Sequence, residues 1–181
     1  MVISTSYFPD LEWFYRLQNG ALIEAHENYQ KQTPRNHCRI MTAQGVAKLS
    51  VPIVQPHRPT AVRDIRVDYT LPWQRTHCRT LVAAYASAPY FSHFWAEIEP
   101  LFGQRHDFLF DLNLSYAQQM ARLLKISAPF SLTDDFMGIT PSEGFQVEPY
   151  YQVFSPVIPF VGGLSVLDFL FCENSWRARS E

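Results

Sequence analysis

Ala21-Leu22-Ile23-Glu24-Ala25 is a short apolar run that leads into the stretch His26-Glu27-Asn28-Tyr29-Gln30-Lys31-Gln32-Thr33-Pro34-Arg35-Asn36-His37-Cys38-Arg39-Ile40. The apolar run is typical of a β-strand. Residues 38–41 and 48–54 form two further runs of this kind, on either side of a Gln44-Gly45 turn. Two runs separated by a short loop that contains glycine predict a β-hairpin. The polar stretch therefore connects one strand to a hairpin.

Three basic side chains, Lys31, Arg35 and Arg39, lie on this connection and on the first strand of the hairpin. Arg35 is followed by Asn36 and His37, and all three can donate hydrogen bonds to an anion. A planar guanidinium suits a phosphate or a carboxylate that is bound through two hydrogen bonds. A solvated edge strand, on which cations block pairing with another chain, explains the same pattern. We keep both interpretations of these cations.

The first residues of the chain predict a β-α-β unit. Residues 2–3 fit a strand, and residues 11–18 carry apolar side chains at helical spacing between Pro9-Asp10 and Asn19-Gly20. Strand, helix and strand in this order begin an α/β unit. If the two strands pair in parallel, residues 4–7 lie at the carboxyl end of the first strand, where open α/β sheets bind ligands. Hydroxyl groups before a helix also serve as caps, so these residues are site candidates by position.

The middle of the chain predicts three helices, over residues 72–85, 90–102 and 107–126. The third has the clearest spacing of apolar residues and is long enough to act as a scaffold. Asp111 and Asn113 lie off its apolar stripe, so we expect both to be exposed to solvent.

Three further segments complete the expected fold. Residues 64–69 alternate charged and apolar side chains, which predicts a half-buried strand. Residues 148–154 predict a late strand, and residues 164–172 a short apolar helix. Ser165 and Asp168 fit a capping box at the start of that helix.

Together these elements predict an α/β (or α+β) fold in one domain of residues 1–181. We expect a small mixed sheet with an N-terminal β-α-β unit and a hairpin, followed by a helical middle and a C-terminal strand and helix. The length of 181 residues suits a single domain, and a hydrophobic content of 47% is ample for a core.

The composition narrows the class of partner. The formal net charge is −2, so no overall basic field favours nucleic acid. The cysteines Cys38, Cys78 and Cys172 are far apart and have no spacing typical of a metal or redox pair. We therefore expect free thiols in a reducing compartment, with neither a metal nor a cofactor. No apolar run approaches the ~20 residues of a spanning helix, and no secretory signal precedes the first helix, so we expect a cytoplasmic protein without membrane insertion.

Four short segments rich in aromatic and polar residues follow one another along the chain. They are Tyr7-Phe8-Pro9 with Trp13-Phe14, Tyr29-Gln30-Lys31 with Arg35-Asn36, Trp73-Gln74-Arg75-Thr76-His77 with Ala88-Pro89-Tyr90-Phe91, and Tyr150-Tyr151-Gln152-Val153-Phe154 with Leu164-Ser165-Val166-Leu167-Asp168-Phe169-Leu170-Phe171. In this order they resemble the WbqC-like protein family, named for a protein encoded in bacterial O-antigen gene clusters. The resemblance covers nearly the whole chain.

The resemblance implies an enzyme of surface-polysaccharide (O-antigen) biosynthesis, with acyl or aminoacyl transfer to an amino-sugar nucleotide as the reaction. Within it we assign Arg35 and Lys31, with Asn36 as a further donor, to the diphosphate of a sugar nucleotide. The rings of Tyr7, Tyr29 and Trp73 would contact its sugar or base. The oligomeric state is left open.

His77 is the expected general base, because an unperturbed imidazole has a pKa near ~6.5. A histidine on an apolar helix face is also a common core residue, and that alternative stays open.

A second hypothesis is a non-catalytic accessory protein that binds a sugar nucleotide in the same pathway. Two departures from the family pattern favour it. The family usually carries a His-Gln-Pro run just before the tyrosine, where this chain has Ile3-Ser4-Thr5. The family also usually has a longer segment before the last strand than residues 131–148 provide.

Overall fold

The N-terminal β-α-β unit forms as the sequence predicts. In the computed structural model, which describes residues 1–142, 145–155 and 157–173, β1 (Val2–Ser4) pairs in parallel with β2 (Leu22–Glu24). The helix α1 (Leu11–Gln18) connects the two strands. Asp10 caps this helix, because its Oδ1 accepts a hydrogen bond from the Trp13 N–H at 3.0 Å. Parallel pairing places the loop that follows β1 at the carboxyl end of this sheet.

The predicted hairpin also forms. β3 (His37–Thr42) and β4 (Gly45–Ser50) are antiparallel, with His37 opposite Ser50. Gly45 has a φ of 101°, a conformation that L residues with a side chain rarely adopt. The hairpin is not hydrogen-bonded to β1 and β2, so the described residues form two separate two-stranded sheets. The expectation of one small mixed sheet is therefore wrong, because the strands form two sheets, whereas the α/β class is confirmed.

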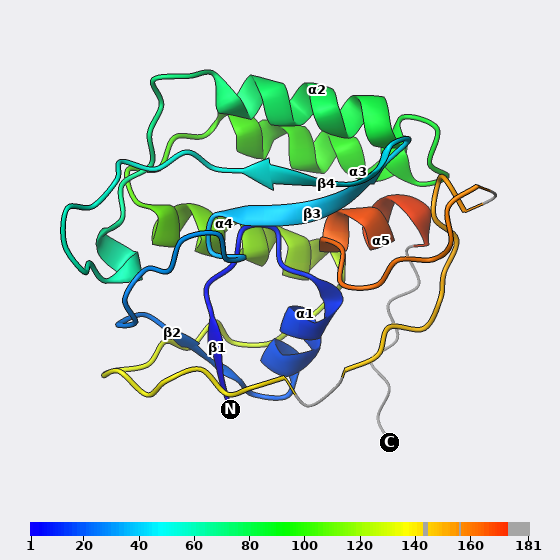
Figure 1. Cartoon of the computed structure of the whole chain (residues 1–181). Coiled ribbons are helices and arrows are strands. Elements are labelled where there is room, and N and C mark those ends of the chain that lie inside the picture. Colours follow the sequence, from blue (N-terminus) through cyan, green and yellow to red (C-terminus); the bar gives the residue numbers. More distant parts are fainter. Residues whose placement is uncertain (143–144, 156, 174–181) are drawn as a thin grey trace.

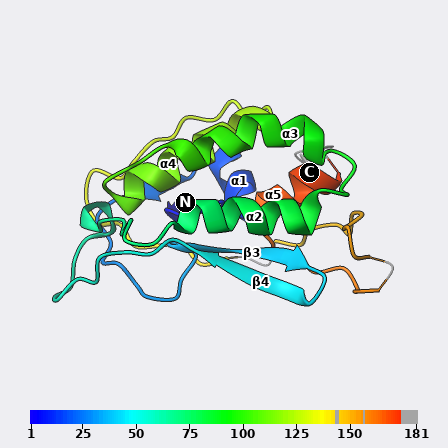
Figure 2. The same cartoon turned by 90° about the horizontal axis from the view of Figure 1, so that it is seen from above.

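In the described residues, five α-helices and two short 3-10 helices surround these sheets. Their bounds are η1 (Val62–Asp64), α2 (Trp73–Tyr85), α3 (Phe91–Ile98), η2 (Glu99–Gly103), α4 (Leu109–Leu123) and α5 (Val166–Cys172). Figure 1 shows the hairpin between α2 and the β1–β2 pair, and Figure 2 shows α2 lying along the hairpin with α3 and α4 beyond it. None of the helices in the described part of the chain combines the length and the apolar character that a membrane span requires.

The helix expected over residues 90–102 is divided in two. α3 ends at Ile98, and the chain continues as the 3-10 helix η2, which has a proline in its first turn. Pro100 lacks the N–H that an α-helix would need at this point, and its ring clashes with the preceding turn. The tighter 3-10 turn avoids this clash, and Gly103 ends the element as expected.

Two predicted strands do not form. Within residues 64–69 the apolar side chains of Ile65 and Val67 are buried as expected, but Val67 and Arg66 make only isolated bridges, to Ile53 and Phe108. Residues 148–154 form no strand. Gln152 instead begins a turn, in which its carbonyl accepts a hydrogen bond from the Ser155 N–H at 2.8 Å. In both segments, side-chain packing holds the backbone in place, and the segment does not pair along its length with a neighbouring strand.

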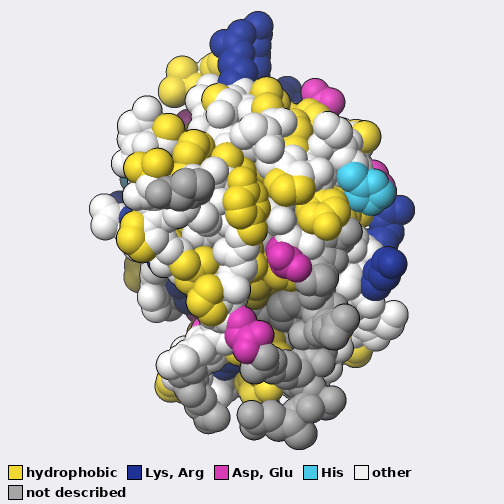
Figure 3. Space-filling model, turned by 90° about the vertical axis from the view of Figure 1, so that its right-hand side faces the viewer, with side chains coloured by type: hydrophobic (Ala, Val, Ile, Leu, Met, Phe, Trp, Pro, Cys, Tyr) yellow, Lys and Arg dark blue, Asp and Glu magenta, His cyan; other side chains and the backbone are white. Residues whose placement is uncertain are grey.

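The face of the molecule that carries α5 exposes many apolar side chains. Figure 3 views this face and shows hydrophobic side chains spread among uncharged ones, with few charged groups. In the segment before α5, Tyr151 and Val157 are the large hydrophobic residues that remain exposed, at 48% and 87%.

Asp168 joins α5 to the rest of the fold. Its carboxylate accepts hydrogen bonds from the hydroxyls of Tyr85 and Tyr150, both at 2.7 Å, and from Nε2 of Gln152 at 2.8 Å. The Tyr85 hydroxyl in turn accepts the N–H of Met41 in β3 at 2.9 Å. Burial raises the pKa of Asp168, and the three donors oppose this shift. The capping interpretation is therefore right for Ser165, which accepts from the Leu167 N–H, whereas the Asp168 carboxylate lies in the core.

Replacement of Asp168 by asparagine tests this connection. We expect Asp168→Asn to lower the free energy of unfolding by about 1–3 kcal/mol, because its amide would turn an N–H group toward donors that now meet an oxygen. Chemical denaturation followed by circular dichroism measures the change. Asp111→Asn, at an exposed carboxylate in the first turn of α4, is the matched control. Equal stabilities of the two variants would contradict the expectation.

Candidate functional site

A cavity of about 260 Å³ opens at the carboxyl end of β1. Its walls come from the loop after β1, the start of α1, the start of the hairpin and the residues just before α5. The lining residues are Ile3, Ser4, Thr5, Ser6, Tyr7, Phe8, Asp10, Glu12, Trp13, Arg16, Pro34, Arg35, His37, Cys38, Arg39, Ile139, Ser142, Gly163 and Ser165. This is the end of a parallel strand where α/β sheets place their ligands.

The loop after β1 is held tightly in place. The N–H of Tyr7 and the hydroxyl of Ser6 both donate to the carbonyl of Pro34, at 2.9 and 3.2 Å. The indole of Trp13 donates to the carbonyl of Ser4 at 2.7 Å. Phe8 has a φ of 41°, which a residue with a side chain adopts at some cost. Its buried ring, 5.0 Å from that of Tyr116 between centroids, keeps the backbone in this conformation.

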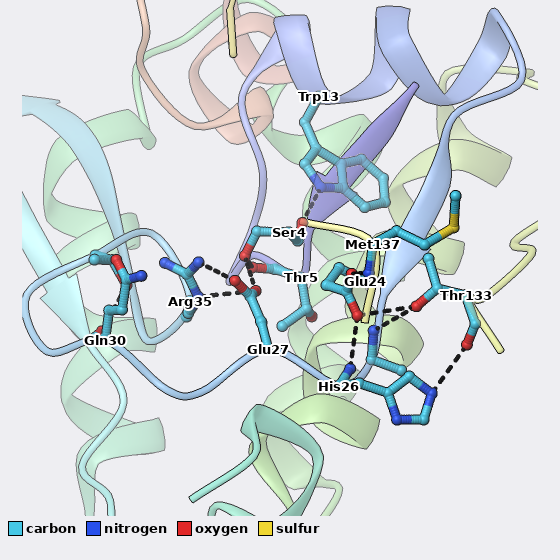
Figure 4. A network of polar contacts seen from close by, with 12 residues as sticks. Ser4, Thr5, Trp13, Glu24, His26, Glu27, Gln30, Arg35, Thr133 and Met137 are labelled. Atoms are coloured by element: carbon cyan, nitrogen blue, oxygen red, sulfur yellow. Dashed lines mark hydrogen bonds and ion pairs between the residues drawn. The ribbon is translucent and has the colours of Figure 1, made fainter. Parts of the chain in front are cut away.

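A buried ion pair between Glu27 and Arg35 supports one wall of the site, which Arg35 itself lines. Nε of Arg35 donates to Oε1 of Glu27 at 2.9 Å, and an Nη group donates to the other carboxylate oxygen. Ser4 donates to the same Glu27 oxygen at 2.7 Å, as Figure 4 shows. The two residues are only 4% and 7% exposed. The guanidinium expected to face a diphosphate therefore faces a carboxylate of the protein.

Asn113 supports this wall from behind. Its side-chain amide donates to the carbonyl of Arg35 at 2.7 Å, and the residue is buried. The prediction that Asn113 faces solvent is wrong, because the hairpin connection covers this side of α4. Asp111 is exposed, as expected.

Glu24, at the end of β2, carries a second buried carboxylate. It accepts hydrogen bonds from the N–H groups of His26 and Met137, both at 2.8 Å, and from the Thr133 hydroxyl at 3.0 Å. Burial by itself raises the pKa of Glu24, but these hydrogen bonds together outweigh it and hold the pKa below its ordinary value of 4.5. Glu24 is therefore a fixed anion that anchors residues 133–137 against β2.

His77 lies behind the cavity and not on its wall. Its Nδ1 is 2.9 Å from the hydroxyl of Tyr7 in a buried hydrogen bond, and Tyr7 is one of the lining residues. Burial lowers the pKa of His77 to about 4, with a backbone hydrogen bond at Ser50 opposing the shift. The ring is thus neutral near pH 7. Trp73 packs against both residues, with ring centroids 5.1 Å from His77 and 6.3 Å from Tyr7.

The other predicted site residues lie away from the cavity wall. Lys31 is exposed, and Tyr29 is partly buried, with a backbone N–H that donates to Thr60 at 2.9 Å. Asn36 uses its amide N–H on the Val51 carbonyl at 3.1 Å. Of the seven predicted residues, the structure brings Tyr7 and Arg35 to the cavity, with His77 and Trp73 packed behind Tyr7.

Ser4, Thr5 and Ser6, which are site candidates by position, also line the cavity, and so do His37 and Arg39 from the stretch of possible anion donors. His37 and Arg39 lie two positions apart and so share a face of β3. Asp10 also lines the cavity and was not a site candidate. Burial and the neighbouring cations Lys48 and Arg39 lower the pKa of His37. The sequence predicts that Asp10 lies at the start of a helix, and only the tertiary structure places it at a cavity.

Activated nucleophiles and metal ligands are not evident at the cavity. Burial raises the pKa of Cys38 to about 12, so this lining thiol stays protonated. Within the described ranges, no three His, Cys, Asp or Glu side chains come together in a way that could hold a metal ion.

Comparison with known proteins gives one match. The family model described as the WbqC-like protein family matches residues 5–146. This range contains Tyr7, Glu27, Arg35 and His77, and it stops short of α5. No curated protein and no solved structure matches the chain.

Breaking the ion pair tests its structural role. We expect Arg35→Met to lower the free energy of unfolding by about 3–5 kcal/mol, because it leaves the Glu27 carboxylate buried without a cation. Arg122→Met breaks the pair between Arg122 and Glu97, whose side chains are 66% and 44% exposed, and should cost at most about 1 kcal/mol. Denaturant unfolding of both variants makes the comparison. Similar losses would show that the Glu27–Arg35 pair contributes no more than a surface pair.

The lowered pKa of Glu24 makes a prediction about pH. A carboxylate whose pKa is depressed on folding contributes stability above its unfolded pKa and loses it as the pH falls through the folded value. Glu24→Gln should therefore be less stable than wild type at pH 7 by about 1–3 kcal/mol. The difference should shrink below about pH 4.5, the ordinary glutamate value. Thermal unfolding between pH 7 and pH 3 measures it, and a constant difference would contradict the assignment.

Proposed function

The chain belongs to the WbqC-like protein family, and we propose that it is a cytoplasmic transferase of bacterial surface-polysaccharide (O-antigen) biosynthesis. The substrate would be an amino-sugar nucleotide, and the reaction an acyl or aminoacyl transfer to its amine. One observation carries the proposal: a cavity at the carboxyl end of β1 that has an arginine, Arg39, free to meet a phosphate.

Arg39 is better placed for the phosphate than Arg35. It is exposed, it lines the cavity, and no carboxylate among the described residues pairs with its guanidinium. Its Nη1 lies 3.6 Å from the point where a side chain at Gly163 would begin. The guanidinium therefore lies beside Gly163 at this wall. We assign Arg35 a positioning role, since its hydrogen bonds to Glu27 hold the cavity wall together.

The size of the cavity limits what it encloses. Small-molecule sites usually measure about 300–1,000 Å³, and this cavity measures about 260 Å³. It would hold one moiety of a sugar nucleotide, the sugar with its nearest phosphate, while the nucleoside extends through the mouth. Tyr7 would contact the sugar, and its hydroxyl is held by His77.

In the transfer, the neutral sugar amine attacks the carbonyl of a thioester donor and forms a C–N bond. The C–S bond breaks, and the departing thiolate takes the proton that the nitrogen gives up. His77 would assist through Tyr7 and not as the base itself, because its own ring does not line the cavity and its pKa of about 4 is low for that role.

A non-catalytic sugar-nucleotide-binding protein of the same pathway is the second candidate. The specific observation that favours it is that a thiol and a carboxylate at or near the cavity are not available as nucleophile or base. The Cys38 thiol stays protonated, and the Glu27 carboxylate is occupied by Arg35 and Ser4. Both candidates require binding at the same place, and they differ only in turnover.

Binding is tested by calorimetric titration with UDP-linked and dTDP-linked amino sugars. At least one should bind the wild type, and Arg39→Gln should weaken it about tenfold, the effect of losing one charge-assisted hydrogen bond. Lys48, directly across the hairpin from Arg39, is exposed and does not line the cavity, so Lys48→Gln is the matched control. Failure of every nucleotide to bind the wild type would rule out the proposed substrate class.

Turnover is tested with the nucleotide that binds, mixed with acyl and aminoacyl thioesters. An enzyme should yield the N-acylated sugar nucleotide, visible by mass spectrometry, at a rate that falls in Arg39→Gln. Binding without any such product would favour the accessory protein.

A further inference from the structure

The cavity carries opposite charges on neighbouring walls. Asp10 lies before α1, and Arg39 lies on β3, and the two segments meet at Ser165. Asp10 forms an isolated antiparallel bridge with Ser165, whose N–H donates to the Arg39 carbonyl at 2.8 Å. Within the described residues, neither charged side chain takes part in an ion pair. Two opposite charges thus face one cavity without neutralising each other through contact.

Two buried polar side chains on the same cavity also lack a partner. His37 is 8% exposed and Thr5 is 1% exposed, and both line the cavity. In the part of the chain that the structure describes, neither the imidazole nor the hydroxyl makes a hydrogen bond. Among the described residues, the fully buried side-chain atoms without a partner belong to Asn36, Trp73, His106 and Asn113. The His37 imidazole and the Thr5 hydroxyl are therefore open to the cavity and can bond to a ligand there. These groups point to a polar ligand, independently of the charges.

The N-terminus of α1 is not the binding site for an anionic group of the ligand, such as a phosphate. Asp10 already caps this helix, and Glu12 lies in its first turn, 3.9 Å from Arg16. These carboxylates compensate the positive end of the helix and would repel a phosphate there. The anionic part of a ligand therefore belongs on the neighbouring wall, beside Arg39 and His37, and the Asp10 carboxylate suits a cation.

We propose that this cavity selects a ligand bearing an ammonium and a phosphate on one small ring, with Asp10 facing the ammonium and Arg39 the phosphate. The inference rests on the proposed function and deepens it, because it makes the free amine of the sugar a recognised group. A hydroxyl or an acetamido group in place of the amine would leave the Asp10 carboxylate without a cation. Burial raises the pKa of Asp10 above its ordinary value, with Glu12 adding to the shift and the Trp13 N–H and Arg39 opposing it. An added cation would stabilise the ionised form.

The test compares three probes by calorimetric titration at pH 7: glucosamine 1-phosphate, glucose 1-phosphate and N-acetylglucosamine 1-phosphate. The wild type should bind the amine about tenfold more tightly than either uncharged analogue, as expected for one charge-assisted hydrogen bond. Asp10→Asn should abolish this preference, so that the three probes bind the variant with similar affinities. Asparagine caps a helix as well as aspartate does, so α1 should remain folded, which circular dichroism verifies.

The control is Asp111→Asn, which removes a first-turn carboxylate from α4 outside the cavity. It should keep the wild-type preference. Equal binding of the three probes by the wild type, or an unchanged preference in Asp10→Asn, would overturn this inference alone. Binding of none of the three would overturn the inference together with the proposed sugar-phosphate site. The wild-type comparison is decisive even if Asp10→Asn proves unstable.

Discussion

The ion pair between Glu27 and Arg35 is the interaction on which the site depends. Glu27 follows β2, Arg35 precedes β3, and Ser4, which donates to Glu27, ends β1. The pair therefore ties together two sheets that share no hydrogen-bonded strands. Burying two charges is costly, and only good geometry with further hydrogen bonds recovers that cost. Two bonds from the guanidinium and one from Ser4 provide that geometry.

This constraint accounts for the position of the cavity. With residue 35 held at β1, the connection before the hairpin covers the loop after β1, and its Pro34 carbonyl accepts from Ser6 and Tyr7. The side chains that follow on β3 then face the start of α1. The cavity thus has a rigid floor of hydrogen-bonded backbone. Asp10 and Arg39, two of its charged side chains, belong to segments that the core holds in place.

Local pattern predicted most of the elements because their causes are local. The spacing of apolar residues, the Asp10 cap and the Gln44-Gly45 turn act over a few residues. The helices α1 and α2 therefore formed within a residue of the expected bounds, and the hairpin formed with its second strand over Gly45–Ser50 in place of residues 48–54. The strand expected over residues 148–154 failed because strand formation needs a partner. Gln152 bonds instead to Asp168 and to the Val161 backbone.

The sequence by itself determined the α/β class, the order of the N-terminal elements and the resemblance to a family, since periodicity and motif order can be read from the chain alone. Only the tertiary structure decided which polar residues meet. It paired Arg35 with Glu27, placed His77 behind Tyr7, and left Asp10 and Arg39 facing one cavity. The physical reason is that ion pairs and cavities depend on distances between segments remote in the chain, which no local spacing encodes.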